Sequence, residues 1–205
     1  SHENHREALE FMRTRLTQKD LVFLWTFDYF KKFRLETEGF EVLTAARYEQ
    51  VITKSAASIE KHFPFDLVNL DFCSQEPVLS LGRIELEIES IEATFNMQAK
   101  HQLGSQKGFL LIYTTLLDQA AVNAQAIARA SNLCHVDGWS GFDLTKIPGI
   151  AANHYERRQA IEGCIRQISA KYGYNIHKYS SLDLNATATQ EVHSIVVGVQ
   201  KSAKV

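Results

Sequence analysis

Two short apolar runs on either side of one long amphipathic segment constrain the fold more than any other feature of this sequence. The first run covers residues 65–73 (FDLVNLDFC) and the second covers 109–115 (FLLIYTT). Apolar runs of this length, bounded by turn-forming residues, are typical of strands buried on both faces of a sheet. Residues 83–103 between them place apolar side chains at helical spacing. This order predicts two parallel neighbouring strands in the centre of a sheet, joined by a right-handed helical crossover. The glutamates expected on the exposed surface of the helix are Glu85, Glu87, Glu89 and Glu92.

The same alternation of strands and helices extends over most of the chain. It predicts an α/β fold with a mostly parallel sheet and helices on both faces. The segments 174–182 and 192–200 are predicted to pair as antiparallel strands at or near one edge of the sheet. Residues 1–38 are interpreted as an N-terminal helical segment and residues 39–205 as the α/β domain. The other predicted elements are helices at 6–16, 48–62, 116–133 and 153–171, a strand at 40–46, and a loop or inserted lid at 134–148. Residues 21–30 fit either a strand or a helix, and a helix is favoured.

Charge, apolar content and cysteine spacing narrow the class of protein. The net charge of -2 provides no overall basic field, so bulk charge does not indicate a nucleic-acid partner, although nucleic-acid and protein partners both stay open. The longest apolar run, residues 21–27, is too short to cross a bilayer, and no secretory signal opens the sequence, so no membrane association is expected. Cys73, Cys134 and Cys164 lie far apart without a C-x-x-C pair. This spacing favours reduced thiols in a cytoplasmic protein over disulfides or a zinc site.

The carboxyl end of the first apolar run carries the strongest candidate site. Asn69 and Asp71 fall on one face of the predicted strand, because side chains alternate with a period of two. Ligands of open α/β sheets bind at the carboxyl ends of the strands. An amide and a carboxylate there could orient an amine or a hydroxyl, and the acid could accept a proton. The alternative is that Asp71 caps the following turn or helix through backbone N–H groups.

Three further motifs have a functional and a structural interpretation each. Cys73 could be a nucleophile if its thiol pKa were lowered, or a small buried apolar residue. His135, Asp137 and Trp139 could bind a ring or a base from a glycine-punctuated loop, or Trp139 could anchor that loop to the core. Residues 154–158 (HYERR) could form a basic patch for phosphate or the solvated face of a helix. No metal-binding motif is present, since the histidines are scattered without H-x-x-x-H or H-E-x-x-H spacing.

The order of these elements resembles the second half of a class I S-adenosylmethionine-dependent methyltransferase. The resemblance covers residues 40 to 200: a strand ending in Asn69-Leu70-Asp71-Phe72, a long helix, the strand at 109–115, another helix and a terminal pair of strands, of which 191–199 is the last. It implies a Rossmann-like sheet and S-adenosylmethionine as the cofactor. In that family the strand corresponding to 65–73 ends in an acidic or Asn-containing motif that faces the methyl group.

Two functions follow from this resemblance. In the first, the chain transfers a methyl group to an unidentified acceptor. Asn69 and Asp71 would then be the catalytic residues that orient the acceptor, while Asp71, Thr114 and Thr115 would line the cofactor cleft. In the second, the chain is a catalytically inactive methyltransferase-like module for binding or assembly within a larger complex. The second is favoured by one departure from the family pattern: no G-x-G loop occurs anywhere in the chain. An unrelated nucleotide-binding α/β enzyme is a third interpretation.

Overall fold

The structure, a computed structural model, describes residues 22–23, 36–37, 41–42, 51–53, 57, 59–72, 83–102, 108–116, 154–185 and 191–202. Its contacts divide the chain into two compact units, residues 1–61 and 62–205. In the first unit, β1 (Val22–Phe23) pairs in parallel with β2 (Glu41–Val42). The short 3-10 helix η3 (Glu60–His62) spans the boundary between the two units. Several predicted features lie outside the described residues: the boundary between residues 38 and 39, the helices at 6–16 and 116–133, the loop at 134–148, and Cys73, Cys134, His135, Asp137 and Trp139.

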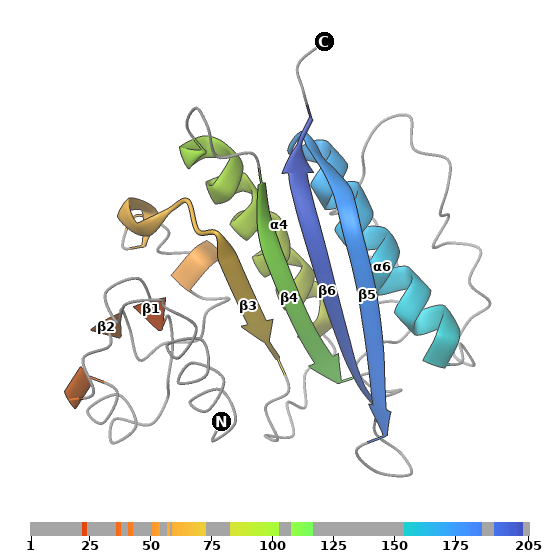
Figure 1. Cartoon of the computed structure of the whole chain (residues 1–205). Helices are drawn as coiled ribbons and strands as arrows, with labels where there is room; N and C mark the ends of the chain where they lie inside the picture. Colours follow the sequence, from red (N-terminus) through yellow and green to blue (C-terminus); the bar gives the residue numbers. More distant parts are fainter. Residues whose placement is uncertain are drawn as a thin grey trace. The chain divides into compact units, whose positions relative to one another are not determined.

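A four-stranded mixed sheet forms the second unit (Figure 1). Its strands are β3 (Leu67–Asp71), β4 (Gly108–Leu116), β5 (Tyr174–Asn185) and β6 (Glu191–Lys201), in the spatial order β3-β4-β6-β5. β3 and β4 are parallel and are joined through α4 (Arg83–His101), whereas β6 is antiparallel to both of its neighbours. α6 (His154–Lys171) precedes β5. The predicted parallel pair with an intervening helix and the predicted antiparallel pair are therefore confirmed.

Within the described residues, the directions and the order of the strands differ from the predicted sheet. Of the three strand pairings in the sheet, one is parallel, because β6 runs against β4 on the side away from β3. β3 is an outer strand of the described sheet and not a central one. α4 and α6 contact each other and lie on the same face of the sheet, and the described ranges place no helix on the other face (Figure 1). β3 is accordingly buried along one side, at Val68 and Leu70, and not on both.

The core lies between the sheet and this helix pair. Its centre is an aromatic cluster in which the rings of Phe95, Phe109 and Tyr174 meet edge to face, with centroids 5.1–5.7 Å apart. Each fully buried aliphatic side chain adds about 1.5–3 kcal/mol of burial free energy. The inward positions predicted for α6 are confirmed, since its isoleucines are buried. The aliphatic core residues of the helices and sheet include Ile88, Ile91, Ile161, Ile165, Ile168, Leu111, Ile195 and Val197.

Two glycines occupy positions where a side chain would not fit or would be strained. Gly173 follows α6 with φ +75°, and its N–H donates to the carbonyl of Ala170 at 3.0 Å, as is typical of a glycine that ends a helix. Gly108 is the first residue of β4, where a Cβ atom would lie 1.9 Å from the carbonyl oxygen of Val199. This close approach requires glycine for β4 to reach its register with β6.

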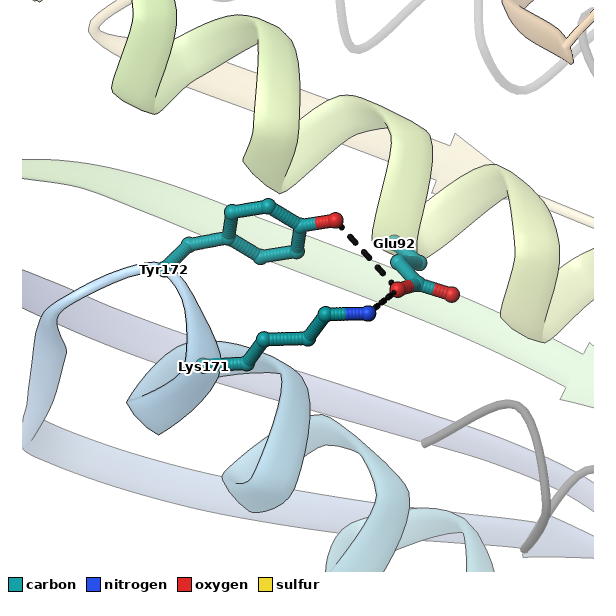
Figure 2. Close-up of polar contacts among 3 residues, drawn as sticks. All are labelled: Glu92, Lys171 and Tyr172. Carbon is teal, nitrogen blue, oxygen red and sulfur yellow. Dashed lines mark hydrogen bonds and ion pairs between the residues drawn. The ribbon is translucent and has the colours of Figure 1, made fainter. Parts of the chain in front are cut away.

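The two helices are also joined by a polar cluster near the end of α6 (Figure 2). Glu92 of α4 forms an ion pair with Lys171 and accepts a hydrogen bond from the Tyr172 hydroxyl at 3.3 Å. Burial, followed by the negative charge of Glu92, raises the pKa of the Tyr172 phenol. Because Lys171 is substantially exposed, the ion pair adds about 0–1 kcal/mol at most.

Candidate functional site

The two faces of the four-stranded sheet have different chemical character. The inner face packs against α4 and α6. On the other face, which we call the distal face, described side chains are partly or largely exposed. Alternation along the strands and the observed registers assign the distal residues. They include Leu67, Asn69 and Asp71 of β3; Leu110, Ile112 and Thr114 of β4; Val192, Ser194, Val196 and Gly198 of β6; and Ser180 and Leu182 of β5.

Polar side chains gather at the carboxyl end of β3 and β4 on the distal face. Asp71 is in register with Thr114, which is in register with Ser194, which is in register with Leu182. These four residues form one row across all four strands, which we call the site row. Within it, the hydroxyl groups of Thr114 and Ser194 share a hydrogen bond of 2.6 Å. A carboxylate and two hydroxyl groups therefore meet at the sheet edge where open α/β folds bind ligands.

Asn69 extends this polar end by one row. It lies two residues before Asp71 on the same strand face and is in register with Ile112, which pairs with Val196. Leu67 and Leu110 form the next row and are apolar. The distal face thus carries apolar side chains beside the polar ones, since Ile112 and Val196 lie in the row of Asn69 and Leu182 lies in the site row.

The backbone at the site row is held by the β3–β4 ladder. The N–H of Phe72 donates to the carbonyl of Thr114 at 2.8 Å, one residue beyond the end of β3. This bond continues the parallel pairing and fixes Asp71 beside Thr114. The relative position of Asp71 and Thr114 is therefore set by backbone hydrogen bonds and not by loop conformation.

The structure brings together three of the four residues predicted from sequence. Asn69, Asp71 and Thr114 share the distal face. Thr115 faces the opposite way: it is 1% exposed, and its hydroxyl donates to Glu87 Oε2 at 2.7 Å on the inner face. Ser194 was not predicted as a site residue. The alternation in 192–200 could have assigned it to the polar side of its strand, but its partnership with Thr114 depends on the β4–β6 register.

Behind the site row, the inner face holds a buried polar cluster that the sequence interpretation missed. Glu87 was predicted to be exposed, and this is wrong: it is 2% exposed and accepts hydrogen bonds from Tyr113 at 2.5 Å and Thr115 at 2.7 Å. Its position explains the error, since residues 87, 91, 94 and 98 follow one helical face that includes buried Ile91. Within the cluster, His193 is in register with Thr115 and its Nε2 lies 3.7 Å from Glu162 Oε1.

Burial controls the ionisation of tyrosines on this inner side. It raises the pKa of Tyr174 to about 12, and the Tyr174 hydroxyl donates to Gln102 Oε1 at 2.6 Å. Burial and then the nearby Glu162 carboxylate raise the pKa of Tyr179. Burial therefore disfavours the phenolate form of both side chains, and the Tyr174 hydroxyl donates a hydrogen bond within the core.

Of the other motifs singled out in the sequence, Cys73, His135, Asp137 and Trp139 lie outside the described residues. Cys164 is buried in α6 as a free thiol. The described residues contain no group of three His, Cys, Asp or Glu side chains placed to hold a metal ion. α6 begins at His154, as predicted to within one residue, but the side chains of 154–158 lie outside the described part of the structure.

Comparisons of the chain with protein-family models, with curated proteins and with solved structures each find no match. Within the described ranges, no helix combines the length and the apolar character needed to cross a bilayer. The geometry of the site row and the order of the strands are therefore the features of the chain that bear on its function.

Proposed function

We propose that the site row binds S-adenosylmethionine or the acceptor of its methyl group, and that residues 62–205 include the second half of a Rossmann-like methyltransferase domain. One observation carries the proposal: the parallel pair β3–β4 joined by α4, followed by the antiparallel pair β5–β6, places Asn69, Asp71 and Thr114 together at the carboxyl end of parallel strands. That is the edge and the strand end at which the resemblance puts the methyl group.

The residues on the site row suit the proposed ligand. Asp71 supplies a negative charge next to two hydroxyl groups, and S-adenosylmethionine presents a positive sulfonium centre and ribose hydroxyls. When bound, this cofactor would supply the methyl group. Asn69 and Asp71 would orient the acceptor by hydrogen bonds, and the Asp71 carboxylate would accept its proton where the acceptor is an amine or a hydroxyl. Because methyl transfer needs mainly alignment of two partners, positioning by β3 and β4 would provide most of the catalysis.

Thr115 would have a different role from Thr114. Its hydroxyl is committed to Glu87 on the inner face, so it would support the strand and not contact the cofactor directly. The proposal therefore assigns ligand contact to Asn69, Asp71, Thr114 and, in addition, Ser194.

A binding or assembly module without catalysis is the second candidate. It is favoured by the absence of a G-x-G loop from the sequence, since that loop holds the amino-acid part of the cofactor in the family. Such a module would keep the strand order and the distal face but would bind a partner through them. Cofactor binding is the property that separates the two candidates.

A titration with S-adenosylmethionine tests the proposal. We expect the full chain to bind it in isothermal calorimetry and to melt at a higher temperature in its presence, because a ligand of the folded state stabilises by mass action. S-adenosylhomocysteine should give the same shift, whereas free methionine and adenosine should give smaller ones. No heat and no shift at millimolar S-adenosylmethionine would favour the assembly module over the enzyme.

A further inference from the structure

We infer that Glu87 is a positioning residue for the site row, acting through β4 from the inner face of the sheet. The inference rests on the proposed function for its ligand, but its structural part can be tested without one. Glu87 contacts no residue of the distal face in the hydrogen bonds described above. It holds the backbone from which that face is presented.

The two hydrogen bonds of Glu87 lie on either side of Thr114 in β4. Tyr113 and Thr115 both donate to Glu87 Oε2, at 2.5 and 2.7 Å. They are two residues apart and point to the inner face, so Thr114 between them points to the distal face. A single carboxylate oxygen thus fixes the residues on both sides of Thr114.

Thr114 is in turn hydrogen-bonded to both neighbouring strands of the sheet. Its carbonyl accepts the Phe72 N–H at 2.8 Å, and its hydroxyl shares a 2.6 Å hydrogen bond with Ser194. The ring of Phe72 also lies against that of Tyr113, with centroids 5.8 Å apart. Movement of β4 at Thr114 would therefore displace Asp71 on one side and Ser194 on the other.

The hydrogen bonds between Glu87 and β4 are buried. Glu87 is almost fully buried, as are Tyr113 and Thr115. Buried hydroxyl groups that lose their hydrogen-bond acceptor are costly. An apolar residue at position 87 would leave two buried hydroxyl groups without this acceptor and would loosen the strand end.

The same helix provides a matched control at the opposite end of the sheet. Gln98 is also buried and also makes two hydrogen bonds: its Nε2 donates to the Phe65 carbonyl at 2.7 Å, and its Oε1 accepts the Phe65 N–H at 2.8 Å. Gln98 holds the amino end of β3, away from the site row. Glu87→Leu and Gln98→Leu remove comparable bonds from the same helix at different ends of the strands.

The experiment measures amide hydrogen exchange by NMR in both variants of the full chain. The Phe72 amide, bonded to Thr114, reports on the site row, and the Leu110 amide, bonded to the Asp66 carbonyl at 2.9 Å, reports on the other end. We expect Glu87→Leu to accelerate exchange at Phe72 by about tenfold more than at Leu110, and Gln98→Leu to show the reverse. Thr115→Val and Tyr113→Phe, which remove one bond each, should give smaller changes in the same direction as Glu87→Leu.

S-adenosylmethionine affinity provides the second readout. Glu87→Leu should weaken binding by about tenfold and Gln98→Leu by less than about twofold, compared at equal fraction folded. If the wild-type chain does not bind S-adenosylmethionine, the proposed function fails, and the exchange data alone decide the role of Glu87. The inference is overturned if Glu87→Leu and the two single-bond variants accelerate exchange equally at Phe72 and Leu110. Glu87 would then contribute to the stability of the whole domain and would not position the site row. Selective acceleration at Phe72 with unchanged affinity would overturn its connection to the ligand.

Discussion

The inner and distal faces of the sheet are made by the same strands, yet they serve different ends. Leu110 and Leu111 are consecutive in β4, but Leu111 is fully buried against the helices whereas Leu110 is 37% exposed on the distal face. The inner face carries the aromatic cluster, and the Glu87 carboxyl group and its two hydroxyl donors are buried there. The distal face carries the site row. We expect this separation to let substitutions in the site row change binding of the proposed ligand with little effect on folding, whereas substitutions of apolar core residues should reduce stability.

The largest expected effect comes from the two leucines themselves. Leu111→Ala should reduce the free energy of unfolding by about 2–5 kcal/mol, because it leaves a cavity under the helices. Leu110→Ala should cost less than about 1 kcal/mol, since its side chain is already partly in water. Urea denaturation of both variants measures the difference. Equal losses would mean that the distal face is as tightly packed as the inner one.

Alkaline pH tests the inner face through Tyr174. Its pKa is about 12 in the folded protein and about 10 in the unfolded chain, so the unfolded state ionises first as the pH rises. The stability that this phenol provides is complete below pH 10 and is lost as the pH approaches 12. We expect the wild-type chain to lose about 2 kcal/mol more than Tyr174→Phe across this window. Parallel denaturation curves for the two proteins between pH 9 and 11.5 would contradict the assignment.

Substitution of the two glycines sharpens the comparison within the scaffold. Gly108→Ala should destabilise by about 1–3 kcal/mol, because the new methyl group would collide with the Val199 carbonyl and separate β4 from β6. Gly173→Ala should cost about 1 kcal/mol, through backbone strain alone, because no atom lies within 4 Å of its Cβ position. Thermal melts of both variants measure the loss of stability. A larger loss for Gly173→Ala than for Gly108→Ala would contradict the close approach of Gly108 to Val199.

Asp71→Asn should have the smallest effect on stability and the largest on the ligand. The carboxylate lies on the distal face and is partly exposed, so we expect a change within about 0.5 kcal/mol and loss of S-adenosylmethionine binding. If Asp71 is instead a structural cap, the variant should lose about 0.5–2 kcal/mol with little change in affinity. A denaturant melt and a calorimetric titration of the same preparation distinguish these outcomes.

The sequence predicted the elements better than their environment. The strands at 65–73 and 109–115, the helix at 83–103 and the final antiparallel pair were all readable from apolar spacing. The prediction that β3 is buried on both faces was wrong. Leu67 and Val68 are both apolar, but the sheet is covered on one face, so Val68 is buried and Leu67 is partly exposed. Side-chain alternation from Val68 to Asp71 already indicated the one-sided pattern.

The candidate site was predictable along a strand but not across the sheet. Asn69 and Asp71 could be paired because two residues separate them on one strand. Ser194 joins them through the β4–β6 register, which is fixed by contacts 80 residues apart and leaves no local signature. Glu87 was misassigned for a related reason. A glutamate is expected on the exposed surface of a helix, and the hydroxyl groups of β4 that donate hydrogen bonds to Glu87 lie on another element.

The interior place of β6 in the sheet has a consequence for how the chain acquires its structure. β6 follows β3, β4 and β5 in sequence but lies between β4 and β5 in space. Until it arrives, β4 and β5 each present an unpaired edge, and the closing contact between Thr114 and Ser194 must bridge 80 residues. Closing so long a loop is entropically unfavourable and slow compared with helix formation. The early folding species should therefore hold the β3–α4–β4 unit with an exposed strand edge, the kind of surface that chaperones bind and that promotes aggregation when β6 is delayed.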